Sequence, residues 1–241
     1  MRARTSRNRL HSMQHETLLQ CITALLIVGS LPASAGSLGV SPLRLTLSNA
    51  HGIASVTVEN NGREEALVQA ETFAWSQTTG EHKLSPTQDV VAVPPIFRLA
   101  PGAQQRIRVG LTRTFTDTKE QAFRLTITEV PTIVTPGTIA VAVRHSLPIF
   151  VQPPSTISSN LRVKLIPSGG LEITNNGSQH LRIHRWRWLD GSGAILAEDT
   201  GPGYLLAGAS QILMVAGQRI TVPSVFEGDS DAVTLKTAVG E

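Results

Sequence analysis

Short stretches in which apolar and polar residues alternate dominate this chain, and they constrain its fold more than any other feature. Residues that alternate in this way place one face of a β-strand in a core and the other in water. After residue 36 such stretches lie at 43–47, 54–60, 66–75, 105–111, 123–130, 139–151, 161–166, 170–176, 181–189, 194–198, 210–215 and 232–239. Helical periodicity is hard to find there. Many short strands at this spacing predict an all-β fold made of sandwiches.

Glycine-containing turn signals separate these stretches. They lie at 60–62, 78–80, 100–102, 135–137, 175–177, 190–193 and 201–203. Asn-Asn-Gly occurs early in both halves, at 60–62 and 175–177, which hints at related topologies. The best boundary is Gln152-Pro153-Pro154-Ser155, so we expect an N-terminal domain at 36–153 and a C-terminal domain at 154–241. Each has the usual size of an immunoglobulin-like sandwich.

The first 35 residues have the three parts of a secretory signal peptide. Four arginines precede residue 10, an apolar run covers 21–32, and Ala33-Ser34-Ala35 supplies small residues before a cleavage site. We expect cleavage after Ala35 and export to the periplasm. Cys21, the only cysteine of the chain, leaves with the signal. No later stretch is long and apolar enough to span a membrane.

Removing the signal changes the charge of the chain. The full sequence has 21 Lys and Arg and 18 Asp and Glu, for a net charge of +3. Four of the basic and one of the acidic residues precede residue 36, which leaves 17 of each. The exported chain is therefore neutral overall, and nothing in its charge points to a nucleic-acid partner.

No motif for catalysis or metal binding stands out. Gly-x-Ser-x-Gly, a phosphate loop and paired acidic motifs are all missing from the sequence. His180 and His184 are four apart, but on a strand this separates them by about 13 Å, too far for one metal. We therefore expect no enzyme, no catalytic residue, no metal and no cofactor.

A basic and aromatic cluster lies at 181–189, in Leu-Arg-Ile-His-Arg-Trp-Arg-Trp-Leu. One interpretation is a stacking surface for a sugar or single-stranded nucleic acid. The other is a strand with Trp186 and Trp188 inward and Arg185 and Arg187 outward, which we favour. Asn176-Gly177-Ser178 fits a glycosylation acceptor or a hairpin turn, and we favour the turn.

Four ordered stretches resemble the periplasmic pilus (fimbrial) assembly chaperone family of the chaperone–usher pathway. They are Val-Ser-Pro-Leu-Arg-Leu-Thr-Leu at 40–47, Pro-Pro-Ile-Phe-Arg-Leu-Ala-Pro-Gly at 94–102 with Gln-Gln-Arg-Ile-Arg-Val at 104–109, Glu-Gln-Ala-Phe-Arg-Leu at 120–125 with Glu-Val-Pro at 129–131, and the strand ending Ile-Phe-Val-Gln-Pro at 149–153. Each alone is weak, but the ordered set over 36–153 is specific. The short segment 132–138 is similar to the short-loop branch, and the departures described below suit an archaic one.

The resemblance implies two immunoglobulin-like β-sandwich domains in an L or boomerang arrangement with an interdomain cleft. It implies a chaperone that binds pilin or fimbrial subunits by donor-strand complementation and delivers them to an outer-membrane usher. In that mechanism the chaperone lends an edge strand to a subunit that lacks its last strand. The family's three alternating donor residues align with Ile139, Val141 and Val143.

The resemblance also implies a cationic anchor for the C-terminal carboxylate of the subunit. Arg44 matches the family's first-strand arginine, but Pro148 stands where the family has a lysine. Arg144, on the same strand and of the same parity, and Arg124, on the strand expected beside it, are two substitutes. Glu120 matches an acidic residue of the family's interdomain ion network.

The family's interdomain arginine is Gln152 in this chain, so that network is incomplete. Two rivals stay open: a secreted adhesin or carbohydrate-binding sandwich that uses the His-Arg-Trp-Arg-Trp cluster at 184–188, and a metal-dependent hydrolase.

Overall fold

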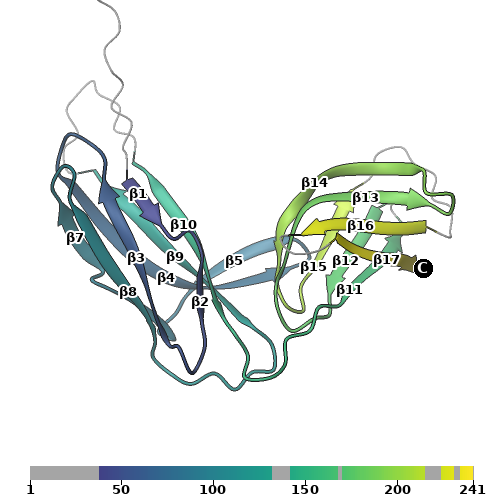
Figure 1. Cartoon of the computed structure of the whole chain (residues 1–241), viewed down its shortest axis with the longest axis horizontal. Coiled ribbons are helices and arrows are strands. Elements are labelled where there is room, and N and C mark those ends of the chain that lie inside the picture. The colour runs from purple at the N-terminus through teal and green to yellow at the C-terminus, as the bar shows by residue number, and fades with distance from the viewer. Residues whose placement is uncertain (1–37, 132–141, 168–169, 215–223, 231–233, 241) are drawn as a thin grey trace, which may run out of the picture. The chain divides into compact units, whose positions relative to one another are not determined.

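All regular secondary structure that the structure describes is β-strand. The structure, a computed structural model, describes residues 38–131, 142–167, 170–214, 224–230 and 234–240 (Figure 1). The strands are β1 (Leu38–Ser41), β2 (Leu45–Leu47), β3 (Ile53–Asn60), β4 (Ala66–Thr78), β5 (Glu81–Pro86), β6 (Val90–Val93), β7 (Ile96–Leu99), β8 (Gln104–Leu111), β9 (Gln121–Val130), β10 (Arg144–Val151), β11 (Leu161–Ile166), β12 (Gly170–Asn175), β13 (Leu181–Asp190), β14 (Ile195–Leu205), β15 (Ser210–Met214), β16 (Ser224–Ser230) and β17 (Thr234–Gly240).

The first ten strands form two sheets that share one core. The smaller sheet has the order β1-β3-β8-β6, and the larger has β2-β10-β9-β4-β5, with β7 also paired to β4. Only the β2–β10 pair is parallel in these two sheets. Val56 and Ile107 from the smaller sheet and Leu125 from the larger are fully buried in this core. Their alternation with polar residues is the period-two pattern of the sequence.

The last seven strands form a second sandwich, whose core also includes Trp75 of β4 and Phe150 of β10. They follow the order β14-β13-β16-β17-β11-β12-β15. Ile173, Trp188 and Phe226 are fully buried there. The predicted all-β fold class is confirmed. No helix among the described residues is long and apolar enough to cross a membrane.

The strands that lack clear alternation were not predicted. These are β1, β5, β6, β7 and β16. Short strands flanked by prolines, such as β6 and β7 around Pro94-Pro95, carry too few alternating positions to be told from loop. β10, which ends at Val151, belongs to the first sandwich, and β11, which begins at Leu161, belongs to the second. The chain therefore passes between them in the segment where we expect the domain boundary. The limits 36–153 and 154–241 themselves stay a prediction.

The turn predicted at 201–203 is wrong, because this tripeptide lies inside β14. The pairing of β13 with β14 shifts register between Ile183 and Arg185, which marks a bulge. Gly203 has a φ of 79°, and a Cβ on Gly201 would collide with the carbonyl group of Ile183. Glycine therefore lets the strand bulge and continue where other residues would end it.

The two sandwiches contain the same asparagine-centred corner. Asn60 at the end of β3 donates from Nδ2 to the carbonyls of Glu64 (2.7 Å) and Leu99 (2.9 Å), and its Oδ1 accepts from the amide of Gly62 (2.9 Å). The carbonyl of Asn60 also accepts from the amide of Gly102, at 2.8 Å.

Asn175 at the end of β12 repeats every one of these bonds. Its Nδ2 donates to Gln179 (2.8 Å) and Leu205 (3.0 Å), and its Oδ1 accepts from Gly177 (2.9 Å). Its carbonyl accepts from the amide of Gly208 at 2.7 Å. The recurrence of Asn-Asn-Gly in the sequence therefore reflects one structural device used twice.

Candidate functional site

One edge of β10 has no neighbouring strand along most of its length. On one side β10 pairs with β9 from Arg144 to Val151. On the other side it pairs with β2 over Ile149 to Val151 alone. Among the described residues no strand pairs with 144–148 on that side. This stretch can therefore accept a further strand, as open sheet edges do.

The structure places two of the predicted anchor arginines on either side of Pro148. Pro148 faces Arg124 of β9 across the antiparallel pair. Leu45 of β2 pairs with Ile149, and extrapolating this parallel register by one residue would bring Arg44, which directly precedes β2, beside Pro148. Residues that face each other directly in a sheet project to the same side. Arg44 is exposed, whereas Arg124 is half-buried.

Arg124 is a partly desolvated cation. Its guanidinium carbon lies 3.7 Å from the centroid of the Trp75 ring and 6.0 Å from that of Tyr204. Its Nη1 donates one long hydrogen bond, 3.3 Å, to the carbonyl of Ser146. Burial lowers the pKa of Arg124, and the nearby hydroxyl of Tyr204 offsets part of this effect.

No acidic residue of the described part forms an ion pair with Arg124. A guanidinium has five N–H donors, and the others remain available to an incoming group. A carboxylate is the acceptor that best fits this fork, because it can bind two donors at once.

Arg144 lies apart from the other two arginines. It begins β10, is exposed, and donates from Nε to the hydroxyl of Thr128 at 3.3 Å. Four residues of strand separate it from Pro148, or about 13 Å. One carboxylate therefore cannot contact both Arg144 and the pair beside Pro148.

Of the three predicted donor residues, Ile139 and Val141 lie outside the described residues. Val143 is half-buried and directly precedes β10. Its carbonyl accepts a hydrogen bond of 2.9 Å from the amide of Glu129 on β9. The antiparallel pairing thus extends toward the predicted donor segment, and the role of the three residues stays a prediction.

Glu120 joins the two sandwiches, and its partner is a histidine. Its Oε1 lies 2.7 Å from Nδ1 of His180 and accepts a hydrogen bond of 3.0 Å from the amide of His180. The amide of Glu120 in turn donates to the carbonyl of Ser178, at 2.8 Å. The imidazole of His180 stacks on Phe150 with 3.6 Å between ring centroids. The sequence singled out His180 only as half of a metal pair with His184, and no pattern pointed to Glu120 as its partner, which lies sixty residues away in the chain.

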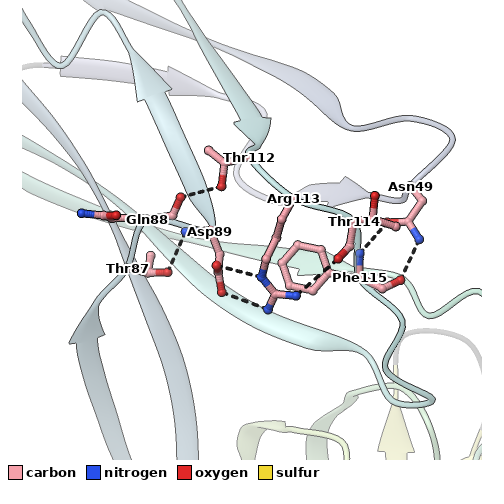
Figure 2. Close-up of polar contacts among 8 residues, drawn as sticks. All are labelled: Asn49, Thr87, Gln88, Asp89, Thr112, Arg113, Thr114 and Phe115. Carbon is pink, nitrogen blue, oxygen red and sulfur yellow. Dashed lines mark hydrogen bonds and ion pairs between the residues drawn. The ribbon is translucent and has the colours of Figure 1, made fainter.

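The connection that leads to Glu120 is held by the contacts that Figure 2 shows. Nδ2 of Asn49 donates to the carbonyl of Phe115 (2.7 Å), and the amide of Phe115 donates to Oδ1 of Asn49 (2.9 Å). Arg113 lies 4.0 Å from the centroid of the Phe115 ring and makes two bonds, of 2.8 and 3.0 Å, to the carboxylate of Asp89. The hydrogen bond from Arg113 lowers the pKa of Asp89. The buried Phe115 ring therefore anchors this loop against the first core.

The basic and aromatic cluster of β13 is part of a core. Trp186 and Trp188 are buried, so their rings present no stacking surface to a ligand. Arg187 lies on the other face, 3.7 Å from carboxylate oxygens of both Glu227 and Asp229. The inward and outward arrangement that we favoured is the one observed.

Comparison with known protein families shows which family this chain belongs to. Residues 37–156 match the model of the pili and flagellar-assembly chaperone family, PapD N-terminal domain. This chain belongs to the pilus assembly chaperone family. The predicted family resemblance is thereby confirmed.

Individual relatives of this chaperone agree with the family assignment. Chaperone protein FaeE of Escherichia coli is 24% identical over 184 residues, which is 73% of this chain and 69% of the relative. The chaperone is also similar to the CsuC–CsuE chaperone–tip adhesion subunit complex of archaic Csu pili from Acinetobacter baumannii. That likeness has a TM-score of 0.63 and 18% identity over 85% of this chain and 98% of the other. The chain is likewise similar to a Salmonella enterica structure of SafA pilin with the SafB chaperone. That likeness has a TM-score of 0.64 and 19% identity, and it covers 85% of this chain and 97% of the other.

Proposed function

We propose that this chain is a periplasmic chaperone that binds pilin or fimbrial subunits by donor-strand complementation and delivers them to an outer-membrane usher. The observation that carries the proposal is the unpaired edge of β10 over 144–148. Backbone N–H and C=O groups on such an edge bind an extended segment of another chain. A subunit with an incomplete sandwich would add its own strand there.

Alternating apolar residues supply the side-chain part of this interaction. Ile139, Val141 and Val143 share one parity, and all three are β-branched. Side chains of one parity project to one face of a strand, where they can fill the open groove of a subunit. Burying them offsets the cost of ordering both segments.

Arg124 and Arg44 form the anchor for the subunit's terminal carboxylate. Pro148 has no cationic side chain and no N–H, so the flanking strands must provide the donors. Arg124 combines partial burial with unused donors, which strengthens a charge-assisted bond. Arg144 contacts a different part of the bound segment.

Export, processing and chain organisation complete the proposal. The signal at 1–35 directs the chain to the periplasm, and cleavage leaves Gly36 as the first residue. The N-terminal domain at 36–153 carries the donor strand, and the domain at 154–241 supports it. The mechanism needs no cofactor and no bond-breaking chemistry, in keeping with a non-enzymatic family.

Co-expression with a candidate pilin from the same operon tests the function. A stable one-to-one complex recovered from the periplasm is the expected result, and mass spectrometry of its chaperone should show a chain beginning at Gly36. A pilin that reaches the same yield and solubility without this chaperone would contradict the proposal.

A peptide assay tests the anchor separately. The probe is a synthetic peptide of the subunit's last strand, made with a free C-terminal carboxylate and as the C-terminal amide. Wild-type protein should prefer the carboxylate by about tenfold or more, as a charge-assisted hydrogen bond predicts. Arg124→Ala and Arg44→Ala should each reduce this preference. Arg106→Ala, at an exposed arginine of β8, is the matched control and should keep it. Equal affinities for the two peptides in the wild type would refute the anchor.

A further inference from the structure

The tip of the β4–β5 hairpin contacts the second sandwich. β4 ends at Thr78, and the two turn residues Thr79 and Gly80 both have positive φ, of 49° and 86°. The amide of Gly80 donates a hydrogen bond of 2.9 Å to the carbonyl of Ser210, where β15 begins. The hairpin therefore reaches beyond its own sheet, and residues 36–241 group as one unit by their contacts.

Gln77, at this tip, holds the end of β14 by both groups of its side-chain amide. Its Nε2 donates to the carbonyl of Tyr204 and its Oε1 accepts from the amide of Leu206, each at 2.7 Å. A primary amide matches the donor and acceptor of a peptide backbone, as a neighbouring strand would. Leu205, between the two gripped residues, is fully buried, and its carbonyl accepts a bond from Asn175. Gln77 thus binds backbone that is already fixed in the second sandwich.

The two hydrogen bonds of Gln77 hold in place residues that pack around Arg124. Gln77 and Trp75 are two apart on β4 and project to the same face. The ring of Tyr204 meets that of Trp75 edge to face, with centroids 5.8 Å apart and planes at 89°. The guanidinium of Arg124 covers the Trp75 ring at 3.7 Å. Tyr204, Trp75 and Arg124 therefore form one packed group, and Gln77 fixes the backbone of its member from the second sandwich.

We propose that Gln77 is a positioning residue of the subunit-binding site: by holding Tyr204 against Trp75, it keeps the guanidinium of Arg124 oriented toward an incoming carboxylate. This rests on the proposed function, in which Arg124 binds the terminal carboxylate of a subunit. Gln77 itself contacts no part of the subunit.

Amide hydrogen exchange in the free protein tests the first half of this inference. In Gln77→Ala the amides of Leu206 and Gly80 should lose protection by about tenfold or more, because their acceptors are removed or released. The amide of Ala209 donates to the carbonyl of Leu206, and this bond does not involve the β4–β5 hairpin. This amide should therefore keep its protection, and it serves as the internal reference. Gln104→Ala, at an exposed glutamine bonded to Glu59, is the matched control. Unchanged protection at Leu206 in Gln77→Ala would overturn the inference.

The carboxylate and amide peptides test the second half. Gln77→Ala should lower the preference for the carboxylate peptide several-fold, whereas Gln104→Ala should not. Trp188→Ala removes a fully buried side chain that faces Ala197 on β14, away from the segment that Gln77 binds, and so destabilises the second sandwich without removing a hydrogen bond to that segment. This variant should also keep the preference, since stability alone does not distinguish the two peptides. If Gln77→Ala keeps the preference, or Trp188→Ala loses it equally, Gln77 has no positioning role.

The results for the wild type, Arg124→Ala and Gln77→Ala distinguish a failure of this inference from a failure of the proposed function. A wild type without any preference for the carboxylate peptide refutes the anchor. A preference that Arg124→Ala abolishes and Gln77→Ala leaves intact refutes the positioning role and keeps the proposed function.

Discussion

Replacing Asn175 by alanine should cost the second sandwich about 3 kcal/mol of unfolding free energy. The side chain is fully buried and makes three hydrogen bonds, to Gln179, Leu205 and Gly177. A buried hydrogen bond contributes about 1 kcal/mol net. Asn175→Ala removes all three and leaves the carbonyl of Leu205 without that donor. A loss of about 3 kcal/mol raises the unfolding equilibrium constant by roughly two orders of magnitude.

Urea titration followed by tryptophan fluorescence measures this loss, because Trp186 and Trp188 belong to the same core. With a urea slope of about 2 kcal/mol per molar, the midpoint should fall by about 1.5 M at unchanged slope. Asn60→Ala should cost the first sandwich a similar amount, since its side chain makes the equivalent bonds.

The neighbouring asparagines are the matched controls. Asn61 and Asn176 stand beside the two buried residues in the same tripeptides but are exposed. Asn61→Ala and Asn176→Ala should lower the unfolding free energy by less than about 0.5 kcal/mol. Losses below about 1 kcal/mol in both Asn60→Ala and Asn175→Ala would refute the reasoning that these corners hold the sandwiches together.

Three further outcomes follow from particular residues. Partial burial against Trp75 and then the charge of Arg124 lower the pKa of His82, so the unfolded chain binds this proton more readily than the folded protein. The stability from neutral His82 is therefore complete above about pH 6.5 and is lost as the pH falls through the lowered folded-state pKa. His82→Gln should flatten the fall in urea midpoint between pH 7.5 and 5.5, and an identical fall in this variant would contradict the assignment. Gly201→Ala should strongly destabilise the second sandwich or prevent folding, because its Cβ meets a backbone carbonyl. Gly110→Ala, whose Cβ would lie 3.8 Å from the nearest atom, should be tolerated. Similar thermal midpoints for the two variants would contradict the requirement for glycine at the bulge. Trp188→Ala should cost about 3–5 kcal/mol as a core truncation, and a fully stable variant with lost glycan binding would favour the adhesin interpretation.

The alternation of apolar residues was sufficient to predict the all-β class and many of the strands. It works where one face is buried and the other is wet, as in β11 and β13. It failed for Gly-Pro-Gly at 201–203, because a glycine pair is compatible with a turn or with a bulge, and the carbonyl of Ile183 on the facing strand decides between them.

Some residues of the candidate site were predictable from the sequence, and others were not. Its ordered motifs led to the family, and Arg124 was named as a substitute because a neighbouring strand was expected beside Pro148. Gln77, Trp75 and Tyr204 carried no signal, because each is an ordinary residue for its strand. His180 was considered only as a metal ligand. The role of each depends on a partner far away in the chain.

The sequence by itself determined the all-β class, many of the strands and the family, because these follow from local periodicity and from motifs in order, whereas the export signal stays a prediction. The tertiary structure alone decided which cation stands beside Pro148 and which side chains connect the two sandwiches. Strand register and side-chain contact are relations between distant segments. Patterns within one segment cannot specify them, because several pairings of the same strands would bury their apolar faces equally well.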